Sequence, residues 1–260
     1  MSLYETIGKN YARTRRSDPR IAGKLLKILA SSPTVTIADI GAGSGSYALA
    51  LAEHRYRVLA VEPSATMRSQ VIAHPAVEWL DGYAENLPLP DQSVDAAIIM
   101  LAFHHFQNSQ KALSEAHRIV GNGQIILFTF DPEMTTRFWL TEYFPSFIED
   151  VEATFSPIPQ LVSELQTLTG SVINVDPFPL PHDLLDSFAA VGWARPELYL
   201  DGNVRNGISS FAKIDTEEIS EGLSRLQADL RSGGWDKRYG HLRQQKLCDI
   251  GYRFVHSPAT

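Results

Sequence analysis

The chain has 260 residues, and its 23 Lys and Arg against 30 Asp and Glu give a formal net charge of −7. This length suits one α/β domain, and a hydrophobic content of 44% is enough for a sizeable core. The acidic balance argues against a nucleic-acid partner, and no apolar run is long enough to span a membrane. The single cysteine, Cys248, excludes an intrachain disulfide and a multi-cysteine metal site. Because the sequence opens without a secretory leader pattern, we expect a cytoplasmic protein.

Strands and helices are predicted to alternate through the first half of the chain. Apolar residues at helical spacing, such as Ile21, Leu25 and Ile28, predict a first helix. Further helices are predicted over residues 47–53, from Ser64 onwards, and over 112–120. Such alternation indicates a parallel sheet with helices on both faces. The predicted strands cover residues 35–40, 57–62, 77–82, 94–101 and 124–130.

The second half of the chain is less regular and more aromatic. Helices are predicted over Leu161–Leu168, from His182–Asp183 onwards, and over Ile219–Leu230. The segment 171–181 predicts a strand with three alternating prolines, which only an open sheet edge tolerates. Residues 249–255 predict the final strand.

A glycine-rich loop follows the first of the predicted strands, in the segment IADIGAGSGS. Such a loop brings bare backbone and a helix N-terminus to the carboxyl end of the sheet, where ligands bind. The dinucleotide fingerprint G-x-G-x-x-G would need glycine in place of Ser46, and the carboxylate of Asp39 would repel a pyrophosphate. The same carboxylate suits a ligand with an ammonium group, such as S-adenosylmethionine (SAM). Glu62, at the end of the next strand, can accept hydrogen bonds from two ribose hydroxyls.

Five blocks of the sequence carry a resemblance to a known family. They are IADIGAGSGSYALALAE, RVLAVEPSATM, GYAENLPLPDQSVDAAI, FHHF and HRIVGNGQIIL. With these blocks in order over about residues 35–131, the chain resembles the class I SAM-dependent methyltransferases, in the ubiquinone/menaquinone-biosynthesis (methyltransferase type 11) branch. The resemblance implies methyl transfer from SAM to a small-molecule acceptor, with O-, C- and N-methylation all open.

The resemblance also implies a cofactor site. In it, Asp39 and the loop from Gly41 to Gly45 hold the methionine part of SAM, and Glu62 holds the ribose. The N-terminal segment that contains Tyr11 and Arg15 would close over SAM or the acceptor. The alternative for that segment is a solvated basic helix. The family often has Asp where this chain has Tyr83, so the contact with the adenine amino group is expected to differ. The implied cofactor-binding residues are Tyr11, Arg15, Asp39, Gly41, Ala42, Gly43, Gly45, Glu62, Pro63, Met67, Ala84, Glu85 and Leu101.

The family fold implies a doubly wound, Rossmann-like sheet of seven mostly parallel strands. Its antiparallel last strand would lie beside the fifth, with the sixth at the open edge. The chain would be a single methyltransferase domain over residues 1–260. The expected core comprises residues 33–131, 170–181 and 248–256, and the expected, mainly helical cap comprises 1–20, 132–160 and 182–246.

Methyl transfer from a sulfonium needs alignment, and it needs a base only where the acceptor must lose a proton. His104 and His105 follow the fourth strand, and we expect at most one of them at the cleft because successive strand residues face opposite ways. His182 and Asp131 are further candidate bases, with helix-capping roles as the alternative. No metal-ligand spacing is present, so no metal is expected.

A dense group of aromatic residues in the second half of the chain predicts either a pocket for the acceptor or the core of the cap. Two other functions stay open: a SAM-binding sensor or partner protein without catalysis, and an NAD(P)-dependent oxidoreductase. The sequence does not determine the oligomeric state. The aromatic group comprises Phe138, Trp139, Tyr143, Phe144 and Phe147.

Overall fold

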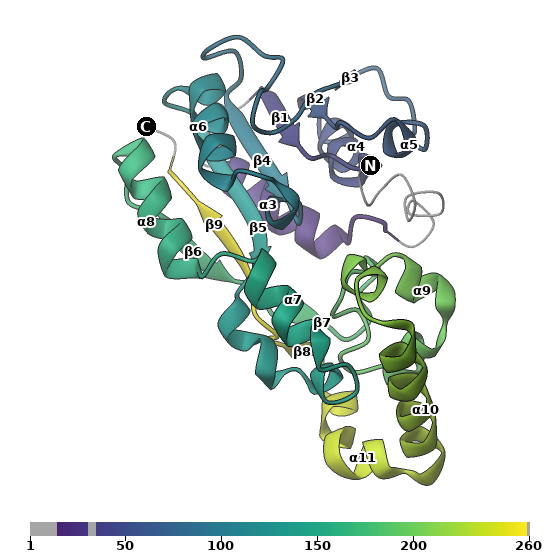
Figure 1. Cartoon of the computed structure of the whole chain (residues 1–260). Coiled ribbons are helices and arrows are strands. Elements are labelled where there is room, and N and C mark those ends of the chain that lie inside the picture. Colours follow the sequence, from purple (N-terminus) through teal and green to yellow (C-terminus); the bar gives the residue numbers. More distant parts are fainter. Residues whose placement is uncertain (1–14, 31–34, 259–260) are drawn as a thin grey trace.

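The computed structural model of the protein describes residues 15–30 and 35–258. Its main sheet has seven strands in the order β3-β2-β1-β4-β5-β9-β6. Strands β1 to β5 pair in parallel, whereas β9 is antiparallel to both β5 and β6. This arrangement confirms the predicted fold class, including the antiparallel last strand inserted beside the fifth (Figure 1). The strands are β1 (Thr36–Ile40), β2 (Arg57–Val61), β3 (Val77–Leu80), β4 (Ala96–Met100), β5 (Gln124–Phe130), β6 (Asn174–Pro177) and β9 (Tyr252–His256).

Helices flank the sheet and form most of the second half of the chain. The α-helices are α3 (Pro19–Leu29), α4 (Ser46–Glu53), α5 (Ala65–Arg68), α6 (Ser109–Val120), α7 (Ser146–Thr154), α8 (Ile158–Thr169), α9 (Gly202–Asn206), α10 (Thr216–Ser232) and α11 (Gly234–Tyr239). The 3-10 helices are η2 (Phe103–His105), η3 (Pro132–Arg137), η4 (Trp139–Glu142), η5 (Pro196–Leu200), η6 (Ser209–Ala212) and η7 (Gly240–Gln244).

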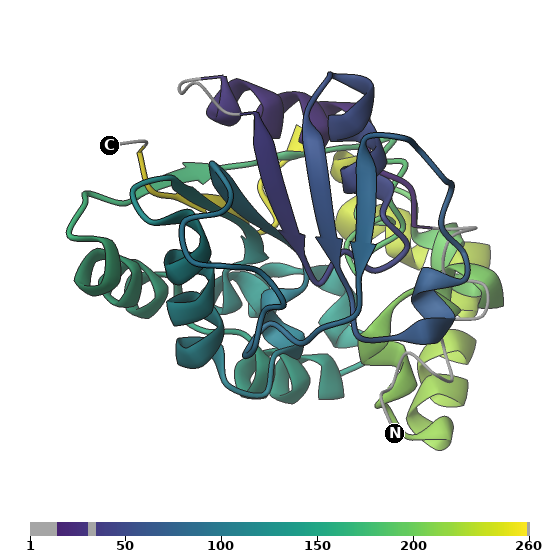
Figure 2. The same ribbon diagram turned by 90° about the horizontal axis from the view of Figure 1, so that it is seen from above.

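The central strands β4 and β5 are buried along their whole length because helices cover both faces of the sheet. Alternate residues of β1 point to different cores. Ile37 packs with the apolar residues of α3 and α4, whereas Ala38 packs with those of α6 and α8. Figure 2 shows α3 on one face of the sheet and α6 and α8 on the other. The predicted two-sided helical cover is thus present.

Local sequence explains where α3 begins. The side chain of Asp18 accepts a hydrogen bond from the backbone N–H of Arg20, and Pro19 occupies the first helical position. The apolar residues of the helix recur at helical spacing and form one buried stripe. That stripe comprises Ile21, Ala22, Leu25, Ile28 and Leu29.

The predicted strand over 171–181 is wrong as a single element. Strand β6 ends at Pro177, and the chain then turns so that β7 (Leu180–Pro181) pairs with β8 (Leu247–Cys248) in a small separate sheet. Pro177 does lie on the open edge, since β6 pairs only with β9 and a missing N–H is tolerated there. Of the three prolines, only this one belongs to the edge strand of the main sheet.

The helix predicted from His182–Asp183 is also wrong, because residues 182–188 form turns and bends. The cause is tertiary. The carboxylate of Asp183 pairs with Arg20 at 2.5 Å, and the backbone N–H of Leu185 donates to Asp18. These contacts hold the turns and bends of the segment against the start of α3.

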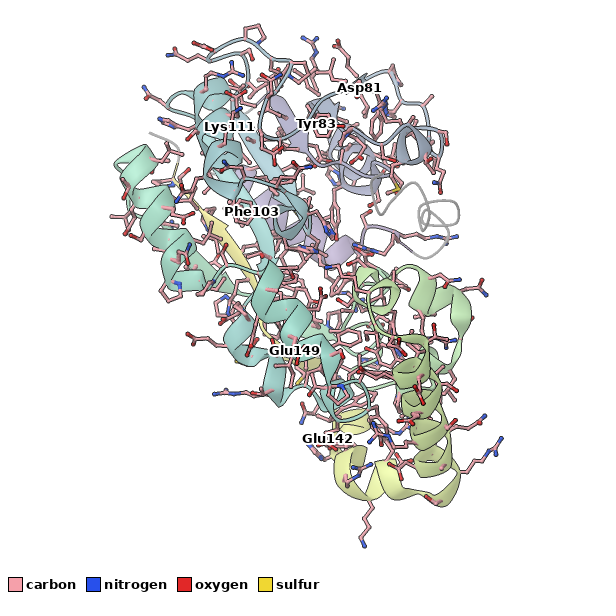
Figure 3. The ribbon with its side chains drawn as sticks, in the orientation of Figure 1. Asp81, Tyr83, Phe103, Lys111, Glu142 and Glu149 are labelled. Carbon is pink, nitrogen blue, oxygen red and sulfur yellow. The ribbon has the colours of Figure 1, made fainter. Side chains whose placement is uncertain are left out.

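Helices α9, α10 and α11 gather at the opposite end of the molecule from β3 (Figure 1). Trp139, Tyr199 and Trp235 are buried there and pack edge to face, with ring centroids 5.3–5.7 Å apart. At the surface of this part, Glu142 pairs with Arg238 at 2.9 Å, and Figure 3 shows Glu142 far from Tyr83 on the sheet side. These aromatic residues belong to the same core cluster as the apolar residues of α3 and α4 on one face of the sheet.

Candidate functional site

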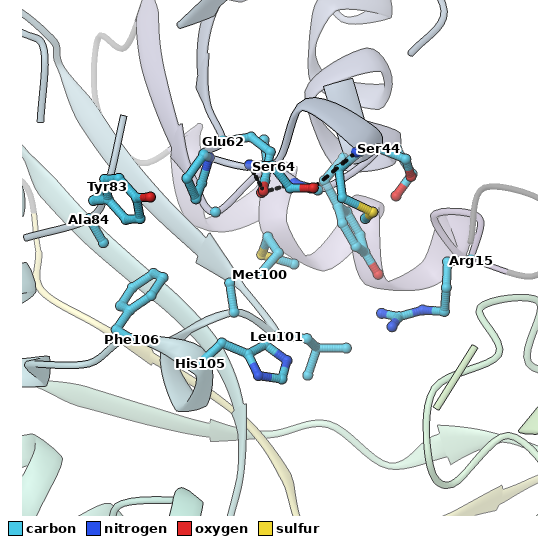
Figure 4. Close-up of a pocket in the computed structure, with 18 of the residues that line it drawn as sticks. Arg15, Ser44, Glu62, Ser64, Tyr83, Ala84, Met100, Leu101, His105 and Phe106 are labelled. Atoms are coloured by element: carbon cyan, nitrogen blue, oxygen red, sulfur yellow. Dashed lines mark hydrogen bonds between the residues drawn. The ribbon is translucent and has the colours of Figure 1, made fainter. Parts of the chain in front are cut away.

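A cleft of about 500 Å3 opens at the carboxyl ends of β1 and β4, where the strand order reverses. The loops after β1, β2 and β4 line it, so we call it the switch-point cleft. Figure 4 shows Glu62 and Ser64 on one side, with Leu101 and His105 facing them. Tyr83 and Ala84 lie towards one end, and Arg15 lies at the other.

The glycine loop needs its glycines for two physical reasons. Gly41, Gly43 and Gly45 have φ angles of 72°, 60° and 79°, a left-handed conformation that residues with a Cβ adopt at a cost. A Cβ on Gly41 would lie 2.7 Å from the Cβ of Ala102, and one on Gly45 would lie 2.5 Å from the ring of Trp79. Gly41, Ala42 and Gly43 line the cleft, whereas Gly45 lies just behind it as the first turn of α4 begins.

Glu62 joins the glycine loop to the start of α5. One carboxylate oxygen accepts the backbone N–H of Gly43 at 2.9 Å, and the other accepts that of Ser64 at 2.9 Å (Figure 4). Burial raises the pKa of Glu62, and the two donated N–H groups act against that rise. Each oxygen keeps a second lone pair, so the carboxylate can accept two more hydrogen bonds on the cleft side.

Asp39 lies at the end of β1 and is 1% exposed. Among the residues that the structure describes, its Oδ2 has no hydrogen-bond partner. Burial, reinforced by the nearby charge of Glu62, raises the pKa of Asp39 to about 7. The carboxyl group is behind the glycine loop and does not line the switch-point cleft itself.

We expect Asp39→Asn to change how stability depends on pH. The carboxyl pKa is about 7 in the folded chain and 3.8 as its usual value, so the folded state binds the proton more tightly. The resulting stabilisation is complete below pH 4 and is lost as the pH rises through 7, by at most about 4 kcal/mol. Urea denaturation at several pH values should show the free energy of unfolding of the wild type falling relative to Asp39→Asn.

The buried histidines also make stability depend on pH, and comparing the two proteins removes their contribution. The pKa of His105 is lowered to about 4 from 6.5, chiefly by burial, so its contribution runs the other way and is lost as the pH falls. Both proteins carry these histidines, and the difference between the two pH profiles isolates Asp39. Parallel profiles between pH 4 and 7 would show that Asp39 is ionised in the folded state.

The end of the cleft near Tyr83 differs from the expected pattern. The Tyr83 side chain is 61% exposed, while Ala84 and Met67 are buried in the wall. The carboxylate of Glu85 accepts the backbone N–H groups of Gln107 and Asn108, at 2.7 and 3.1 Å. Glu85 lines the cleft and at the same time fixes the loop that follows η2. Pro63, which was also predicted, lines the cleft as well.

A buried ionic cluster closes the other end. The guanidinium of Arg15 donates to Asp186 at 2.5 Å, and the hydroxyl of Tyr47 donates to the same carboxylate at 3.2 Å. Asp186 is 1% exposed, and Arg15 is 13% exposed. Arg15 was predicted, but Tyr47 and Asp186 were not. No local pattern could have indicated Asp186, since its partner lies 171 residues away in the chain.

A second cavity of about 70 Å3 adjoins the first, and Arg15, Leu101 and His105 line both. Leu101 has a φ of 53°, a strained conformation for a bulky residue and one that occurs at functional sites. Phe138 and Phe147 of the predicted aromatic group line the second cavity, whereas Trp139, Tyr143 and Phe144 are buried in the core of the helical part. The group is thus divided between the wall of the second cavity and the buried core.

Of the two histidines, only His105 lines the switch-point cleft. His104 and His105 belong to the 3-10 helix η2, so the alternation of a strand does not apply to them. Both line the second cavity, with ring centroids 3.8 Å apart, and His105 also lines the first. Burial lowers the pKa of both imidazoles, that of His105 to about 4.

The remaining candidates lie elsewhere. Asp131 caps η3 by accepting the backbone N–H of Glu133, as its capping alternative predicted. His182 is exposed at the end of β7 and lines neither cavity. Tyr11 lies outside the described residues. Within residues 15–30 and 35–258, no group of three His, Cys, Asp or Glu is placed to hold a metal, and no helix could cross a membrane.

A glycine-loop cleft at the switch point of such a sheet defines a Rossmann-like, ligand-binding α/β protein. Residues 38–128 match the Methyltransferase domain family. A crystal structure from Anabaena variabilis, described as a methyltransferase from an antibiotic biosynthesis pathway, shares 47% identity and a TM-score of 0.89. The match covers 94% of this chain and 98% of that one. The chain therefore belongs to the SAM-dependent methyltransferase family, as its sequence blocks predicted.

Other relatives are more distant. The ubiquinone/menaquinone biosynthesis C-methyltransferase of Rubrivivax gelatinosus is 34% identical over 128 residues, which are 48% of this chain and 47% of that protein. The match thus spans about half the length of this curated relative. The phosphoethanolamine N-methyltransferase 2 of Haemonchus contortus, crystallised with SAM, is 16% identical with a TM-score of 0.60. That match covers 98% of this chain and 56% of that one, and it shows the fold alone.

Proposed function

We propose that the protein transfers a methyl group from SAM to a small-molecule acceptor. The observation that carries this proposal is the meeting of two cavities at three shared residues. A cleft built on a glycine loop and an acid after β2 suits an adenosine ligand, and a smaller cavity adjoins it at Arg15, Leu101 and His105. Two adjoining cavities suit a donor and an acceptor that must meet.

The residues of the switch-point cleft fit SAM. The free lone pairs of Glu62 face the cleft and suit the two ribose hydroxyls, and Met67 and Ala84 offer an apolar wall for the adenine. Asp39 does not line the cleft, and its pKa of about 7 leaves it partly ionised at neutral pH, so we propose that it favours the methionine ammonium through its charge and without direct contact. Arg15 lies at the end where the methionine carboxylate would be bound.

When bound, SAM supplies a methyl group on a sulfonium, and the acceptor would attack that methyl group in line with the carbon–sulfur bond. The chain supplies the relative position of donor and acceptor in a site shielded from water. Leu101 and His105 lie where the two cavities meet, so they would line the point of transfer. His105 is neutral at pH 7, since burial lowers its pKa to about 4, and it is the candidate base nearest the point where the two cavities meet. We place His104 beside it as a second polar group, and His182 has no part in this step.

The segments outside the sheet complete the second cavity. Thr135, Thr141 and Phe147 come from the stretch 132–160, and Ile208 and Ser210 come from the stretch 182–246. We propose that these segments act as the cap over the acceptor, as the sequence predicted. A cavity of this kind favours an enzyme over a sensor that only binds SAM, because a sensor needs no space next to the reactive methyl.

The proposal is tested by calorimetric titration with SAM, S-adenosylhomocysteine and NADH. We expect micromolar binding of the first two and none of the third, because Asp39 disfavours a pyrophosphate and Ser46 breaks the dinucleotide fingerprint. Binding of NADH alone would overturn the assignment in favour of an oxidoreductase. Binding of SAM without turnover of any acceptor would favour the sensor.

A further inference from the structure

We infer that the acceptor is a carboxylic acid with an apolar body, whose carboxylate lies beside Arg15 where the two cavities meet and takes the methyl group on its oxygen. The inference rests on the proposed function and narrows it to a substrate class. Three features of the structure carry it: the charge that faces the second cavity, the place of that charge, and the character of the other walls.

The charge that faces the second cavity is positive. Among the described residues that line this cavity, Arg15 carries the only charged side chain, and none is Asp or Glu. Burial lowers the pKa values of His104 and His105, so both imidazoles are neutral at pH 7. The charge of Lys213 reaches the same two imidazoles and lowers their pKa values further. A carboxylate therefore meets an opposite charge in the wall, whereas an ammonium group meets a charge of its own sign.

The counter-charge of Arg15 lies behind the wall. Nε of Arg15 donates to Asp186 at 2.5 Å, and Asp186 is 1% exposed and lines neither cavity. The guanidinium also lies over the ring of Phe188, with its Cζ 5.9 Å from the ring centroid. These two contacts fix the positive charge at the wall and keep the negative charge out of the cavity. Attraction to the guanidinium needs no vacant N–H group, because charge acts over several ångströms in a site shielded from water.

Arg15 lies where the methyl group must be transferred. Of the residues that the structure describes, only Arg15, Leu101 and His105 line both the second cavity and the switch-point cleft. Figure 4 shows the guanidinium of Arg15 extending towards the other two. A methyl group carried by a cofactor in the cleft would meet an acceptor in the second cavity at this junction. The anionic group that Arg15 attracts is therefore the group nearest the methyl.

The other walls favour an apolar body of no fixed length. Most side chains that line the second cavity are apolar, and Phe138, Phe147 and Phe155 give it aromatic faces. The cavity itself has a volume of about 70 Å3, but through the shared residues it opens towards the cleft of about 500 Å3. Its volume therefore does not limit the acceptor to one ring. The class of acceptor is set by one negative charge and an apolar body.

A carboxylate acceptor needs no base, because a carboxylic acid with an ordinary pKa of about 4 is already ionised at pH 7. In the step we infer, a carboxylate oxygen forms a bond to the methyl carbon while the carbon–sulfur bond breaks and its electron pair goes to sulfur. The negative charge of the acceptor and the positive charge of the sulfonium disappear together, leaving a neutral methyl ester and a neutral thioether. No proton moves, so His105 is not required as a base. The ester no longer carries the charge that Arg15 attracts, which favours its release.

The test uses the full chain saturated with S-adenosylhomocysteine and titrated with phenylacetate, phenylacetamide and phenethylammonium, which share one aromatic body and differ in charge. Phenylacetate should bind with a Kd of about 1 mM or tighter, which is within reach of so small a ligand. The amide should bind at least about tenfold more weakly, because it lacks the negative charge, and the ammonium should not bind. Equal binding of acid and amide, preferred binding of the cation, or no binding of the acid would overturn the inference.

The atom that receives the methyl group is tested with SAM in place of S-adenosylhomocysteine. Phenylacetate should give its methyl ester, identified by mass spectrometry. Release of S-adenosylhomocysteine with methyl transfer to any atom other than a carboxylate oxygen would overturn the assigned site of transfer.

Variants of the buried ion pair locate the charge. In the double variant of Arg15→Met with Asp186→Asn, which removes both charges, the preference for the acid over the amide should fall to about twofold or less. Asp186→Asn alone removes only the counter-charge and should raise that preference, an effect that a loss of structure would not give. Asp183→Asn, at the exposed pair with Arg20, is the matched control and should leave the preference unchanged. A full preference for the acid in the double variant would overturn the role of Arg15.

A cavity-filling change locates the apolar body. Ser209→Phe fills the second cavity from its partly exposed rim and should abolish the binding of phenylacetate and phenylacetamide alike. Ser220→Phe, on the exposed face of α10, is the control and should leave both affinities unchanged. Phenylacetate binding that survives Ser209→Phe would place the acceptor elsewhere.

Failure of this inference can be told apart from failure of the proposed function. If S-adenosylhomocysteine does not bind, the proposed function is overturned and the inference with it. If it binds and the acid has no advantage over the amide, the methyltransferase assignment stands and the acceptor belongs to another class. S-adenosylhomocysteine is kept saturating in each variant, so a weaker contact between Arg15 and the methionine carboxylate does not enter the ratio of the two affinities.

Discussion

Replacing Glu62 with alanine should weaken SAM binding by about 10- to 100-fold, because two charge-assisted hydrogen bonds to the ribose are lost. The structure adds a second reason for a large effect. The same carboxylate accepts the backbone N–H groups of Gly43 and Ser64, so its removal also frees the glycine loop from the start of α5. Calorimetric titration with SAM measures the change directly.

Two further variants separate these contributions. Glu62→Gln keeps one acceptor oxygen and should show an intermediate loss, since an amide cannot accept at both of its ends. Glu78→Ala, at an exposed ion pair with Arg57 on β3, is the matched control and should leave SAM affinity unchanged. Full affinity in Glu62→Ala would remove Glu62 from the cofactor site.

Replacing Asp186 with asparagine should lower the free energy of unfolding by about 3–5 kcal/mol, because it leaves a largely buried guanidinium without its counter-charge. Arg15 is 13% exposed and Asp186 is 1% exposed, so the pair is largely shielded from bulk water. The same carboxylate accepts the hydroxyl of Tyr47 at the cleft wall. We therefore expect a weaker response to SAM as well, and urea denaturation with and without SAM measures both effects.

A double variant tests whether the lower stability of Asp186→Asn comes from breaking its ion pair with Arg15. Arg15→Met combined with Asp186→Asn removes both charges and should recover stability relative to either single change. The exposed pair of Arg20 with Asp183 joins the same two segments, and Asp183→Asn should change stability little. A purely additive double variant would show that Arg15 and Asp186 do not stabilise the chain as an ion pair.

The sequence predicted the central sheet well because its signals are local. Near-continuous apolar runs predicted β4 and β5, and both are buried throughout. Side-chain caps at Asp18, Ser64 and Asn108 begin α3, α5 and α6, and such caps depend only on nearby residues. The spacing of the three glycines fixes three left-handed residues in one loop.

The errors arose where distant contacts override local preference. The strand over 171–181 divides because β8 pairs with Leu180–Pro181, and the helix expected at His182–Asp183 gives way to contacts with Asp18 and Arg20. None of these partners is near in sequence, so no periodicity records them.

The sequence by itself indicated the α/β class and the ligand-binding loop, because periodicity, caps and glycine spacing act over a few residues, whereas the place of the last two strands was implied by the family resemblance. Only the tertiary structure decided what lines the second cavity. The cluster of Arg15 with Asp186, the stacking of His104 on Phe155 and the cavity between them join segments far apart in the chain. Long-range burial sets their geometry and their pKa values, and burial exists only once the chain has folded.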